Sequence, residues 1–329
     1  MPRLPGRTSH RGSGDNGDDH LTGTAALAPN APAPTRRTIL LTGDRGLIGR
    51  WLRRALERDG WQVRGFDIRD GHDIRDAAAV RNAAAGAAVT IHCAALPHDS
   101  AGDAAEITNV NLHGGMNALA AAEVHAHARV LVFSSAQVFG VFDGERPPVA
   151  FPISDRSPRL AGRPYGATKV ALEDATEAFS LRTGIASVCL RPVHVWVPGQ
   201  AADTLRRWRS APALEVEPFW NFGAFVDVRD VISAVRLALS APLEGHQRLL
   251  LCAGDAAASQ PTMALTGRHY PSVPWQPGTR LDTNSTAALF DTSEAERTLG
   301  WKPGYTWAAT SRETLFDRLA RRLKQPFPP

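Results

Sequence analysis

The sequence contains few of the residues that would indicate a disulfide-rich, metal-binding or membrane protein. Among its 329 residues are three cysteines, and its 37 basic residues include only three lysines. Cys93, Cys189 and Cys252 are odd in number and lack metal-ligand spacing, so we expect reduced thiols and no metal site. The chain has no run of about 18 apolar residues and no signal-peptide core. These absences predict a soluble protein of the cytoplasm.

Clusters of charge are also missing from the sequence. The formal net charge is +4, and the arginines are scattered among 33 acidic residues instead of forming blocks. Binding to nucleic acid or to a membrane surface depends on concentrated basic charge, so we expect neither partner. The hydrophobic content of 43% is enough for a full core. The composition therefore predicts a globular protein whose partner is a small molecule.

Strand-like and helix-like segments alternate from residue 38 onwards. Short apolar runs, which predict buried strands, are separated by segments with helical periodicity. This alternation predicts an α/β fold with a doubly wound parallel sheet of the Rossmann type and a smaller C-terminal substrate-binding region. The expected strands are 38–42, 61–67, 88–93, 129–134 and 186–191, and the longest expected helices are 103–126 and 164–181.

The same pattern divides the chain into three regions. Residues 1–36 are rich in Pro, Gly, Ser, Asp and Arg and contain no aromatic side chain, so we expect a disordered extension. Residues 37–192 are expected to form the Rossmann core. Residues 193–329 are expected to form mostly the substrate-binding region, with segments at about 224–252 returning to the sheet.

A glycine turn follows the first expected strand and opens a helix, which is the context that gives such a motif meaning. Gly43 allows the tight turn, Gly46 lets the backbone approach a pyrophosphate, and Gly49 lets the helix pack closely on the sheet. The first amides of the helix, at Leu47 and Ile48, then face the phosphates. The motif predicts that the Rossmann core binds a dinucleotide.

Asp67 stands at the end of the second expected strand. A carboxylate at this place accepts hydrogen bonds from both ribose hydroxyls and repels a 2′-phosphate, which favours NAD over NADP. Arg45, Arg64 and Arg69 are close enough in sequence to keep NADP as the alternative cofactor. A solvated acid at a strand end is the structural alternative for Asp67.

Tyr165 and Lys169 form the second informative motif, because the sequence holds only three tyrosines and three lysines. Residues four apart lie on the same face of a helix, so this pair presents a phenol and an ammonium group to one site. Such a pair is suited to proton transfer. The structural alternative is an exposed tyrosine and a solvated lysine on an amphipathic helix.

Together, the glycine turn, Asp67 and the pair of Tyr165 and Lys169 resemble the extended short-chain dehydrogenase/reductase family, in its NAD-dependent epimerase/dehydratase group. The likeness covers about residues 38–318. It implies that Ser135 is the family's catalytic serine, that Asn111 fixes the active-site helix and that Lys169 also binds the nicotinamide ribose. The further cofactor contacts that it implies are Asp73 and Ile74 by the adenine, Cys93, Ala94 and Ala95 after the third strand, and Pro192 and Val193 after the fifth.

The resemblance implies hydride transfer between a nicotinamide and a secondary hydroxyl or ketone of a sugar-like or natural-product substrate. We expect Tyr165 to take the proton of the hydroxyl while Ser135 hydrogen-bonds the developing carbonyl. A phenol has a pKa of about 10, so Tyr165 needs nearby positive charge to act as a base. We expect Lys169 and the oxidised nicotinamide to supply that charge.

Departures from the family's pattern narrow the reaction. Ala136 and Gln137 stand where the dehydratases carry an acidic pair, which argues against a 4,6-dehydratase. His194 stands where nucleotide-sugar epimerases commonly carry an asparagine, and the short stretch before residue 225 is similar to compact members that oxidise free sugars or sugar acids. A nucleotide-sugar 4-epimerase with bound NAD stays the alternative, and a non-catalytic NAD-binding sensor is the third hypothesis.

The resemblance also indicates where substrate and partner subunits bind. The candidate substrate contacts are Gln137, His194, Trp196 and Trp220, although a tryptophan serves equally well as a core residue. Family members often pair through their two long helices. We therefore expect a homodimer formed by the helices at about 103–126 and 164–181.

Overall fold

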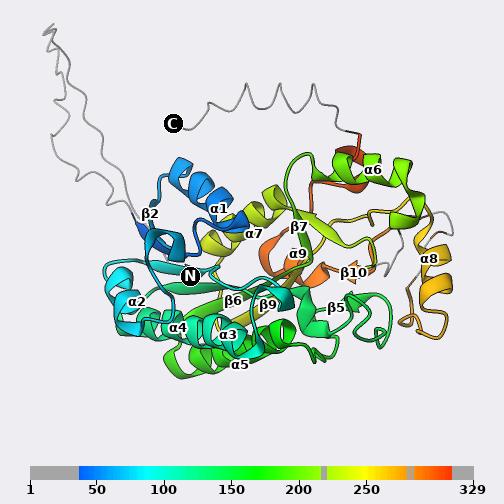
Figure 1. The fold of residues 1–329 in the computed structure, drawn as a ribbon. Coiled ribbons are helices and arrows are strands. Elements are labelled where there is room, and N and C mark those ends of the chain that lie inside the picture. Colours follow the sequence, from blue (N-terminus) through cyan, green and yellow to red (C-terminus); the bar gives the residue numbers. More distant parts are fainter. Residues whose placement is uncertain (1–36, 216–220, 280–281, 283–284, 313–329) are drawn as a thin grey trace, which may run out of the picture. The chain divides into compact units, whose positions relative to one another are not determined.

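The computed structural model describes residues 37–215, 221–279, 282 and 285–312 (Figure 1). The expected disordered extension, residues 1–36, and the candidate substrate contact Trp220 lie outside these residues. Within the described part of the chain, no helix is both long and apolar enough to cross a membrane.

Six parallel strands form the main sheet, in the order β2-β1-β3-β4-β6-β9. Every side chain of β1, β3 and β6 is buried, as expected when helices cover both faces of the sheet. The expected α/β fold of the Rossmann type is thereby confirmed. The strands are β1 (Thr38–Thr42), β2 (Gln62–Phe66), β3 (Val89–His92), β4 (Arg129–Phe133), β6 (Ala186–Pro192) and β9 (His246–Leu251).

Helices form a layer on each face of this sheet (Figure 1). α1 (Leu47–Arg58) and α7 (Val228–Ser240) pack together on one face. α2 (Ala77–Ala84), α4 (Gly114–Val124) and α5 (Pro164–Thr183) cover the other face. In α1 the buried side chains of Leu52, Ala55 and Leu56 share one stripe, as expected of an amphipathic helix on a sheet. In such a sandwich, ligands bind at the carboxyl ends of the strands.

The helix expected over residues 103–126 contains a wider turn. The chain forms α3 (Ala104–Thr108), then a π turn (Asn109–His113), and then α4. Asn111 lies in this turn and is fully buried. π turns inside helices are frequent at functional sites. Apolar periodicity predicts the helix but not this local change of pitch.

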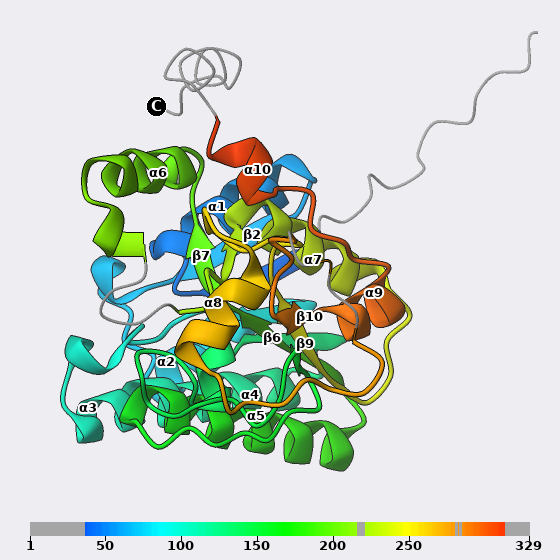
Figure 2. The same ribbon diagram turned by 90° about the vertical axis from the view of Figure 1, so that its right-hand side faces the viewer.

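Two short parallel sheets and several helices form a second, smaller region. β7 (His194–Trp196) pairs with β8 (Phe225–Asp227), and β5 (Ile153–Ser154) pairs with β10 (Phe290–Asp291). Of the segments within 224–252, β9 joins the main sheet, whereas β8 belongs to a small one. α6 and α10 lie side by side in this region (Figure 2). Its helices are α6 (Gln200–Ser210), α8 (Thr262–His269), α9 (Ser293–Leu299) and α10 (Trp307–Thr310).

Candidate active site

The residues predicted to bind the cofactor, together with the predicted catalytic serine, lie at the carboxyl ends of neighbouring strands. Gly43 follows β1, Asp67 follows β2 and Cys93 follows β3. Ser135 lies just beyond β4, and Val193 follows β6. Because all of these strands are parallel neighbours in one sheet, their carboxyl ends form a single edge.

Main-chain contacts leave no room for side chains in the glycine turn. Gly43 has a φ of 71°, and its amide donates to the carbonyl oxygen of Phe66 at 2.8 Å. A Cβ atom at Gly43 would lie 2.6 Å from the amide nitrogen of Ala94, and one at Gly49 would collide with the carbonyl group of Gly43. The turn is therefore held between β2, the loop after β3 and α1, and it requires glycine at both positions.

The amino end of α1 is suited to an anion. Its N-cap residue, Gly46, has no side chain that could cap the helix, and its first turn contains no acidic residue. The amides of Leu47 and Ile48 lie in this first turn, at the positive end of the helix dipole. Together with the space that the glycines leave, this donor set fits the pyrophosphate of a dinucleotide.

Asp67 lies beside the glycine turn and is held by main-chain amides. Its carboxylate accepts from the amide of Arg45 at 3.0 Å and from that of Arg69 at 2.9 Å. The guanidinium groups of both arginines stay nearby, since Arg45 pairs with Asp70 and Arg69 donates to the carbonyl of Arg45. Arg64 instead donates to two carbonyl groups near the end of α2. Of the three arginines considered for NADP, Arg45 and Arg69 are thus the two beside Asp67.

Thr42 fastens the loop after β3 to β1. Its hydroxyl oxygen accepts from the amides of Cys93 at 3.2 Å and Ala94 at 3.3 Å, and the hydroxyl lies 2.8 Å from Nδ1 of His92. Burial, together with the charge of Lys169, lowers the pKa of His92 to about 3. His92 is therefore a neutral, buried side chain that anchors this loop.

Asn111 joins the same loop to α5. Its Oδ1 accepts from the amide of Leu96 at 2.8 Å, and its Nδ2 donates to the carbonyl of Leu96 at 3.1 Å. The same Nδ2 also donates to the hydroxyl of Thr168 at 3.4 Å. The residue thus contacts both the loop that follows β3 and the helix that carries Tyr165.

The other residues predicted to line the cofactor site lie at the ends of three strands or shortly beyond them. Asp73 pairs with Arg75 at 2.6 Å, and this hydrogen bond lowers the pKa of Asp73. Ile74 is buried beside Gly114, where a Cβ atom would touch its side chain. The rest of the set comprises the half-buried Ala95 after β3 and the buried Pro192 and Val193 at the end of β6.

Ser135, Tyr165 and Lys169 form one cluster where β4 meets α5. The side chain of Ser135 lies near the Tyr165 phenol and acts to lower its pKa. The ammonium group of Lys169 lies 5.7 Å from the centre of the Tyr165 ring and donates to the carbonyl oxygen of Phe133 at 2.8 Å. Lys169 is only 3% exposed. The four-residue spacing on α5 therefore places the phenol and the ammonium side by side.

Burial governs the acidity of both groups. Burial raises the pKa of the Tyr165 phenol, the Ser135 side chain opposes this shift, and the charge of Asp99 adds to it. Burial also lowers the pKa of Lys169 to about 8. The ammonium of Lys169 donates to the carbonyl oxygen of Phe133, and burial sets the direction of the Tyr165 shift. The neutral phenol is therefore the favoured form, and positive charge nearby is needed for its deprotonation.

Glu173 is a residue of this cluster that the sequence analysis missed. It is fully buried on α5 and accepts from the hydroxyl of Ser134 at 2.6 Å. The guanidinium of Arg191 donates to both of its oxygens, at 2.8 and 2.7 Å, and also pairs with Asp155 at 3.1 Å. Burial alone would raise the pKa of Glu173, but the hydrogen bonds from Arg191 and Ser134 outweigh burial and lower it.

The position of Ser135 depends on α5. Lys169 holds the carbonyl of Phe133, and Glu173 holds the hydroxyl of Ser134. These are the two residues that directly precede Ser135. Glu173 follows Lys169 by the same four residues that separate Lys169 from Tyr165, and this spacing is the signal that could have identified it.

The candidate substrate contacts do not form one group. Gln137 is half-buried, and its main-chain N–H donates to the hydroxyl oxygen of Ser135 at 3.1 Å. His194 is exposed at the start of β7. Trp196 is buried and stacks on Phe225 with ring centres 4.7 Å apart. Of the two roles considered for Trp196, the structure shows the core one, because the ring is enclosed by apolar neighbours.

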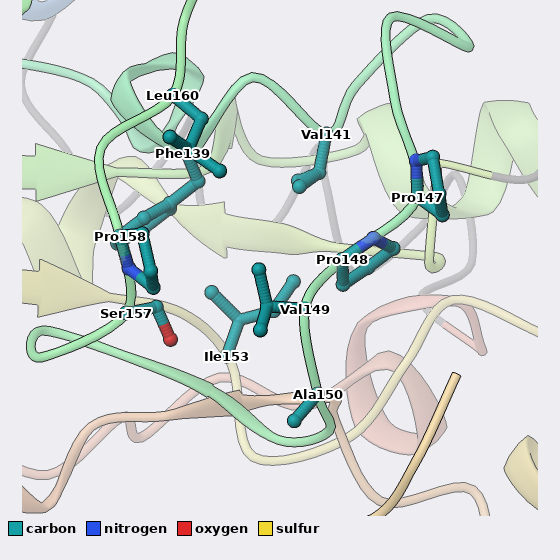
Figure 3. Close-up of a pocket in the computed structure, with 10 residues that line it drawn as sticks. All are labelled: Phe139, Val141, Pro147, Pro148, Val149, Ala150, Ile153, Ser157, Pro158 and Leu160. Atoms are coloured by element: carbon teal, nitrogen blue, oxygen red, sulfur yellow. The ribbon is translucent and has the colours of Figure 1, made fainter.

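An apolar pocket lies beyond the turn that follows Ser135 (Figure 3). The side chains of Val149 and Ile153 point toward one another at its centre, and Ser157 supplies the hydroxyl drawn there (Figure 3). This lining has few groups able to bind sugar hydroxyls, so we do not assign the substrate to it. The pocket is lined by Phe139, Val141, Pro147, Pro148, Val149, Ala150, Ile153, Ser157, Pro158 and Leu160.

Comparison with known proteins identifies relatives of the chain. The sequence model of the NAD dependent epimerase/dehydratase family matches residues 39–252. A dTDP-L-rhamnose 4-epimerase from Burkholderia thailandensis is 29% identical over 168 residues, which cover 47% of this chain and 46% of that protein. The matched part is thus about half of the length of the curated relative.

Solved structures resemble the fold over most of the chain. A short-chain dehydrogenase/reductase superfamily protein from Agrobacterium tumefaciens with bound NAD has a TM-score of 0.66 at 21% identity, and the match covers 88% of this chain and 99% of that one. MoeE5 in complex with UDP-glucose and NAD has a TM-score of 0.62 at 26% identity, and the match covers 88% of this chain and 100% of that one.

Proposed function

The chain belongs to the NAD dependent epimerase/dehydratase family, and from this premise we propose that it transfers hydride between NAD and a secondary hydroxyl or ketone carbon of a sugar. In this proposal Ser135, Tyr165 and Lys169 are the catalytic residues. The observation that carries it is the cluster of Ser135, Tyr165 and the buried Lys169 where β4 meets α5, at the sheet edge that also holds the glycine turn.

NAD is the cofactor of this family, and each part of it has a matching group of residues here. The glycine turn and the amides of α1 would hold the pyrophosphate, and the carboxylate of Asp67 would hold the adenosine ribose. Lys169 would bind the nicotinamide ribose. The residues that would line the remaining surface are Asp73, Ile74, Cys93, Ala94, Ala95, Asn111, Pro192 and Val193.

When bound, NAD supplies the acceptor and donor of hydride. In the direction of oxidation, Tyr165 takes the proton of the substrate hydroxyl, and Ser135 donates a hydrogen bond to the oxygen that becomes a carbonyl. The form of Tyr165 that takes this proton is the phenolate, which the positive charge of Lys169 would stabilise and which becomes the neutral phenol in the step. In the direction of reduction, Tyr165 returns the proton, and the neutral phenol that burial favours is the form required.

A nucleotide sugar is the substrate class that we infer. MoeE5 was solved with UDP-glucose, and the relative from Burkholderia thailandensis acts on a dTDP-linked sugar according to its name. His194, by contrast, replaces an asparagine common in nucleotide-sugar epimerases and favours a free sugar. Both classes of sugar therefore enter the test of the proposal.

A nucleotide-sugar 4-epimerase is the second candidate, favoured by the name of that same relative. An epimerase would return the hydride to the opposite face of the ketone, so that NAD is regenerated within each cycle. The same three residues serve both reactions. The two candidates therefore differ in net NADH formation and not in their catalytic residues.

Released ligands and NADH formation together test these candidates. We expect denaturation of the purified protein to release NAD, which mass spectrometry identifies along with any retained sugar. Stoichiometric NADH absorbance after addition of UDP-glucose, a dTDP-sugar or the free sugar would establish a dehydrogenase. Interconversion of sugars without net NADH would establish the epimerase. Neither signal from NAD-loaded protein with any of these sugars would contradict both candidates.

We propose a homodimer that forms through α4 and α5. These helices expose large apolar side chains, with Met116 48%, Val124 62% and Leu181 80% accessible. Apolar patches on neighbouring helices favour association of two identical surfaces. Light scattering at micromolar concentration should give a dimeric mass, and Leu181→Glu should reduce it to that of a monomer. A monomeric wild-type protein would contradict this proposal.

We propose the cytoplasm as the location of the protein. Cys93, Cys189 and Cys252 are all unpaired, and unpaired thiols are typical of a reducing compartment. Fractionation of the native host, with an antibody against the chain, would test this proposal. Recovery of the protein outside the cytoplasmic fraction would contradict it.

A further inference from the structure

The first turn of α5, which carries Tyr165, has no cap from its own sequence. The N-cap residue, Arg163, makes no side-chain hydrogen bond to the helix. Pro164 occupies the first helical position and has no amide hydrogen. The amide of Tyr165 is therefore the first amide in α5 that needs an acceptor from outside the helix.

Asp99 supplies this acceptor from a distant part of the sequence. Its Oδ1 accepts the N–H of Tyr165 at 2.7 Å, across a separation of 66 residues. Asp99 begins a short turn, Asp99–Ala101, in the loop after β3. A carboxylate at the positive end of a helix dipole makes a strong, charge-assisted cap. The carboxylate thus links this loop directly to the backbone of the reacting tyrosine.

The other end of the same loop is fastened to the predicted cofactor site. Its first two amides bind the hydroxyl of Thr42 at the end of β1. Leu96 then exchanges two hydrogen bonds with Asn111, which also contacts Thr168 on α5. The loop therefore connects the glycine turn to α5, and its contact at Asp99 is the one made to Tyr165 itself.

We propose that Asp99 is a positioning residue for the reaction, because it ties Tyr165 to the loop that borders the predicted cofactor site. Its role in turnover rests on the proposed function. Its effect on Tyr165 can be measured without any substrate.

The charge of Asp99 has a separate consequence for the phenol. A nearby carboxylate disfavours the phenolate, and this effect adds to burial in raising the pKa of Tyr165, against the effect of Ser135. Lys169 faces the ring from the same helix, and His92 and Cys93 of the β3 segment lie near that ammonium. Asp99 therefore both holds Tyr165 in place and favours its neutral form.

Two substitutions separate the contact from the charge. Asp99→Asn keeps an oxygen acceptor and removes the charge, whereas Asp99→Ala removes both. Asp103→Asn is the matched control, because Asp103 lies in the same segment but caps α3. The sequence has only three tyrosines, so ¹³C-labelled tyrosine gives three resolvable NMR signals, and Tyr165→Phe identifies the one from Tyr165.

In NAD-saturated protein, we expect Asp99→Asn to lower the pKa of Tyr165 while the Tyr165 amide exchanges with solvent at the wild-type rate. Asp99→Ala should also lower this pKa, and the amide should exchange about fivefold faster, the factor that corresponds to one lost cap. Asp103→Asn should change neither value. An unchanged Tyr165 titration in both Asp99 variants, or wild-type exchange in Asp99→Ala, would overturn the proposal.

Turnover gives a second readout of positioning. We expect the pH profile of kcat to move to lower pH in Asp99→Asn, and kcat to fall with little change in KM in Asp99→Ala. A wild-type profile and kcat in both variants would overturn the proposal. Absence of turnover in the wild-type protein, with the NMR results as expected, would support the contact and count against the proposed function alone.

Discussion

The glycine turn and the amino end of α5 lie at the same edge of the sheet, but they are held by different kinds of contact. The turn is fixed by main chain, because Gly43 and Gly49 approach neighbouring backbone so closely that a Cβ atom does not fit. The end of β4 is fixed to α5 by two buried ionisable side chains, Lys169 and Glu173. The glycine turn therefore has no room for an added atom, whereas the end of β4 depends on side-chain contacts from α5.

Removing the buried carboxylate of Glu173 on α5 should have the largest effect on stability. Glu173→Gln leaves Arg191 without its closest partner, so we expect a loss of about 3–5 kcal/mol in the free energy of unfolding at pH 7. Asp155→Asn is the matched variant, because Asp155 pairs with the same guanidinium group of Arg191. Burial raises the pKa of Asp155 to about 6, so its ionised form is disfavoured in the fold, and we expect this variant to change the free energy of unfolding by no more than about 1 kcal/mol.

Urea unfolding at several pH values measures this difference. The lowered pKa of Glu173 means that its stabilisation is present above its ordinary pKa of 4.5 and is lost as the pH falls below that value. The raised pKa of Asp155 means the opposite, so stability due to this group falls as the pH rises from 3.8 through about 6. Equal losses in the two variants at pH 7 would contradict the account.

Adding a methyl group to the glycine turn should have the next largest effect. In Gly49→Ala the new Cβ meets the backbone of Gly43 and Asp44, and we expect a loss of about 3 kcal/mol in the free energy of unfolding. Because the turn that would hold the pyrophosphate is displaced, we also expect about 100-fold weaker NAD binding, or about 3 kcal/mol of binding free energy. Calorimetric titration with NAD and urea unfolding measure both quantities.

Gly267→Ala provides the control for this prediction. Gly267 lies within α8, where a Cβ atom meets nothing within 4 Å. We expect this variant to gain about 0.5–1 kcal/mol from the lower chain entropy of alanine, with unchanged NAD binding. Equal changes in the free energy of unfolding and in NAD affinity in Gly49→Ala and Gly267→Ala would contradict the account of the glycine turn.

Lys169→Met should reduce activity and increase stability. Burial lowers the pKa of Lys169 from 10.5 to about 8, so its charge opposes folding below pH 8, and this cost disappears as the pH rises through 10.5. At pH 7 we expect a gain of about 1–3 kcal/mol in the free energy of unfolding, after loss of the bond to Phe133. Lower stability of the variant at pH 7 would contradict this account of Lys169.

Asp67→Asn should give the smallest of these effects, a change in cofactor preference. Removal of the carboxylate charge leaves Arg45 and Arg69 beside the ribose position, so we expect about a tenfold shift in relative affinity toward NADPH. Fluorescence titration with NADH and NADPH measures the ratio. Adding Arg45→Gln should cancel the shift, whereas Arg64→Gln should not, because Arg64 binds the end of α2. An equal response to Arg45→Gln and Arg64→Gln would contradict the placement of Arg45 beside the ribose position.

The fold and the cofactor side were predictable because local rules decide them. Apolar runs with intervening helical periodicity predicted strands in a parallel sheet, and glycine at positions 43, 46 and 49 follows from the space that a strand–turn–helix leaves. The spacing of Tyr165 and Lys169 placed both side chains on one face of α5 for the same reason.

Contacts between distant segments were not predictable in this way. The hydrogen bond between Asp99 and Tyr165 spans 66 residues, and the pair of Arg191 and Asp155 joins β6 to the residue after β5. Trp196 shows the same limit on the substrate side. Its sequence context suits a sugar platform and a core residue equally, and only packing against Phe225 decides for the core.

The effect of Tyr165→Phe on NADH formation tests the central claim most directly. The substitution removes one hydroxyl from a half-buried ring, so NAD affinity should stay at the wild-type value. Turnover of the sugar, measured as NADH formation or as epimerisation, should fall about 10²–10⁴-fold. Turnover close to that of the wild-type protein, with NAD binding intact, would contradict the assignment of Tyr165 as the group that moves the proton.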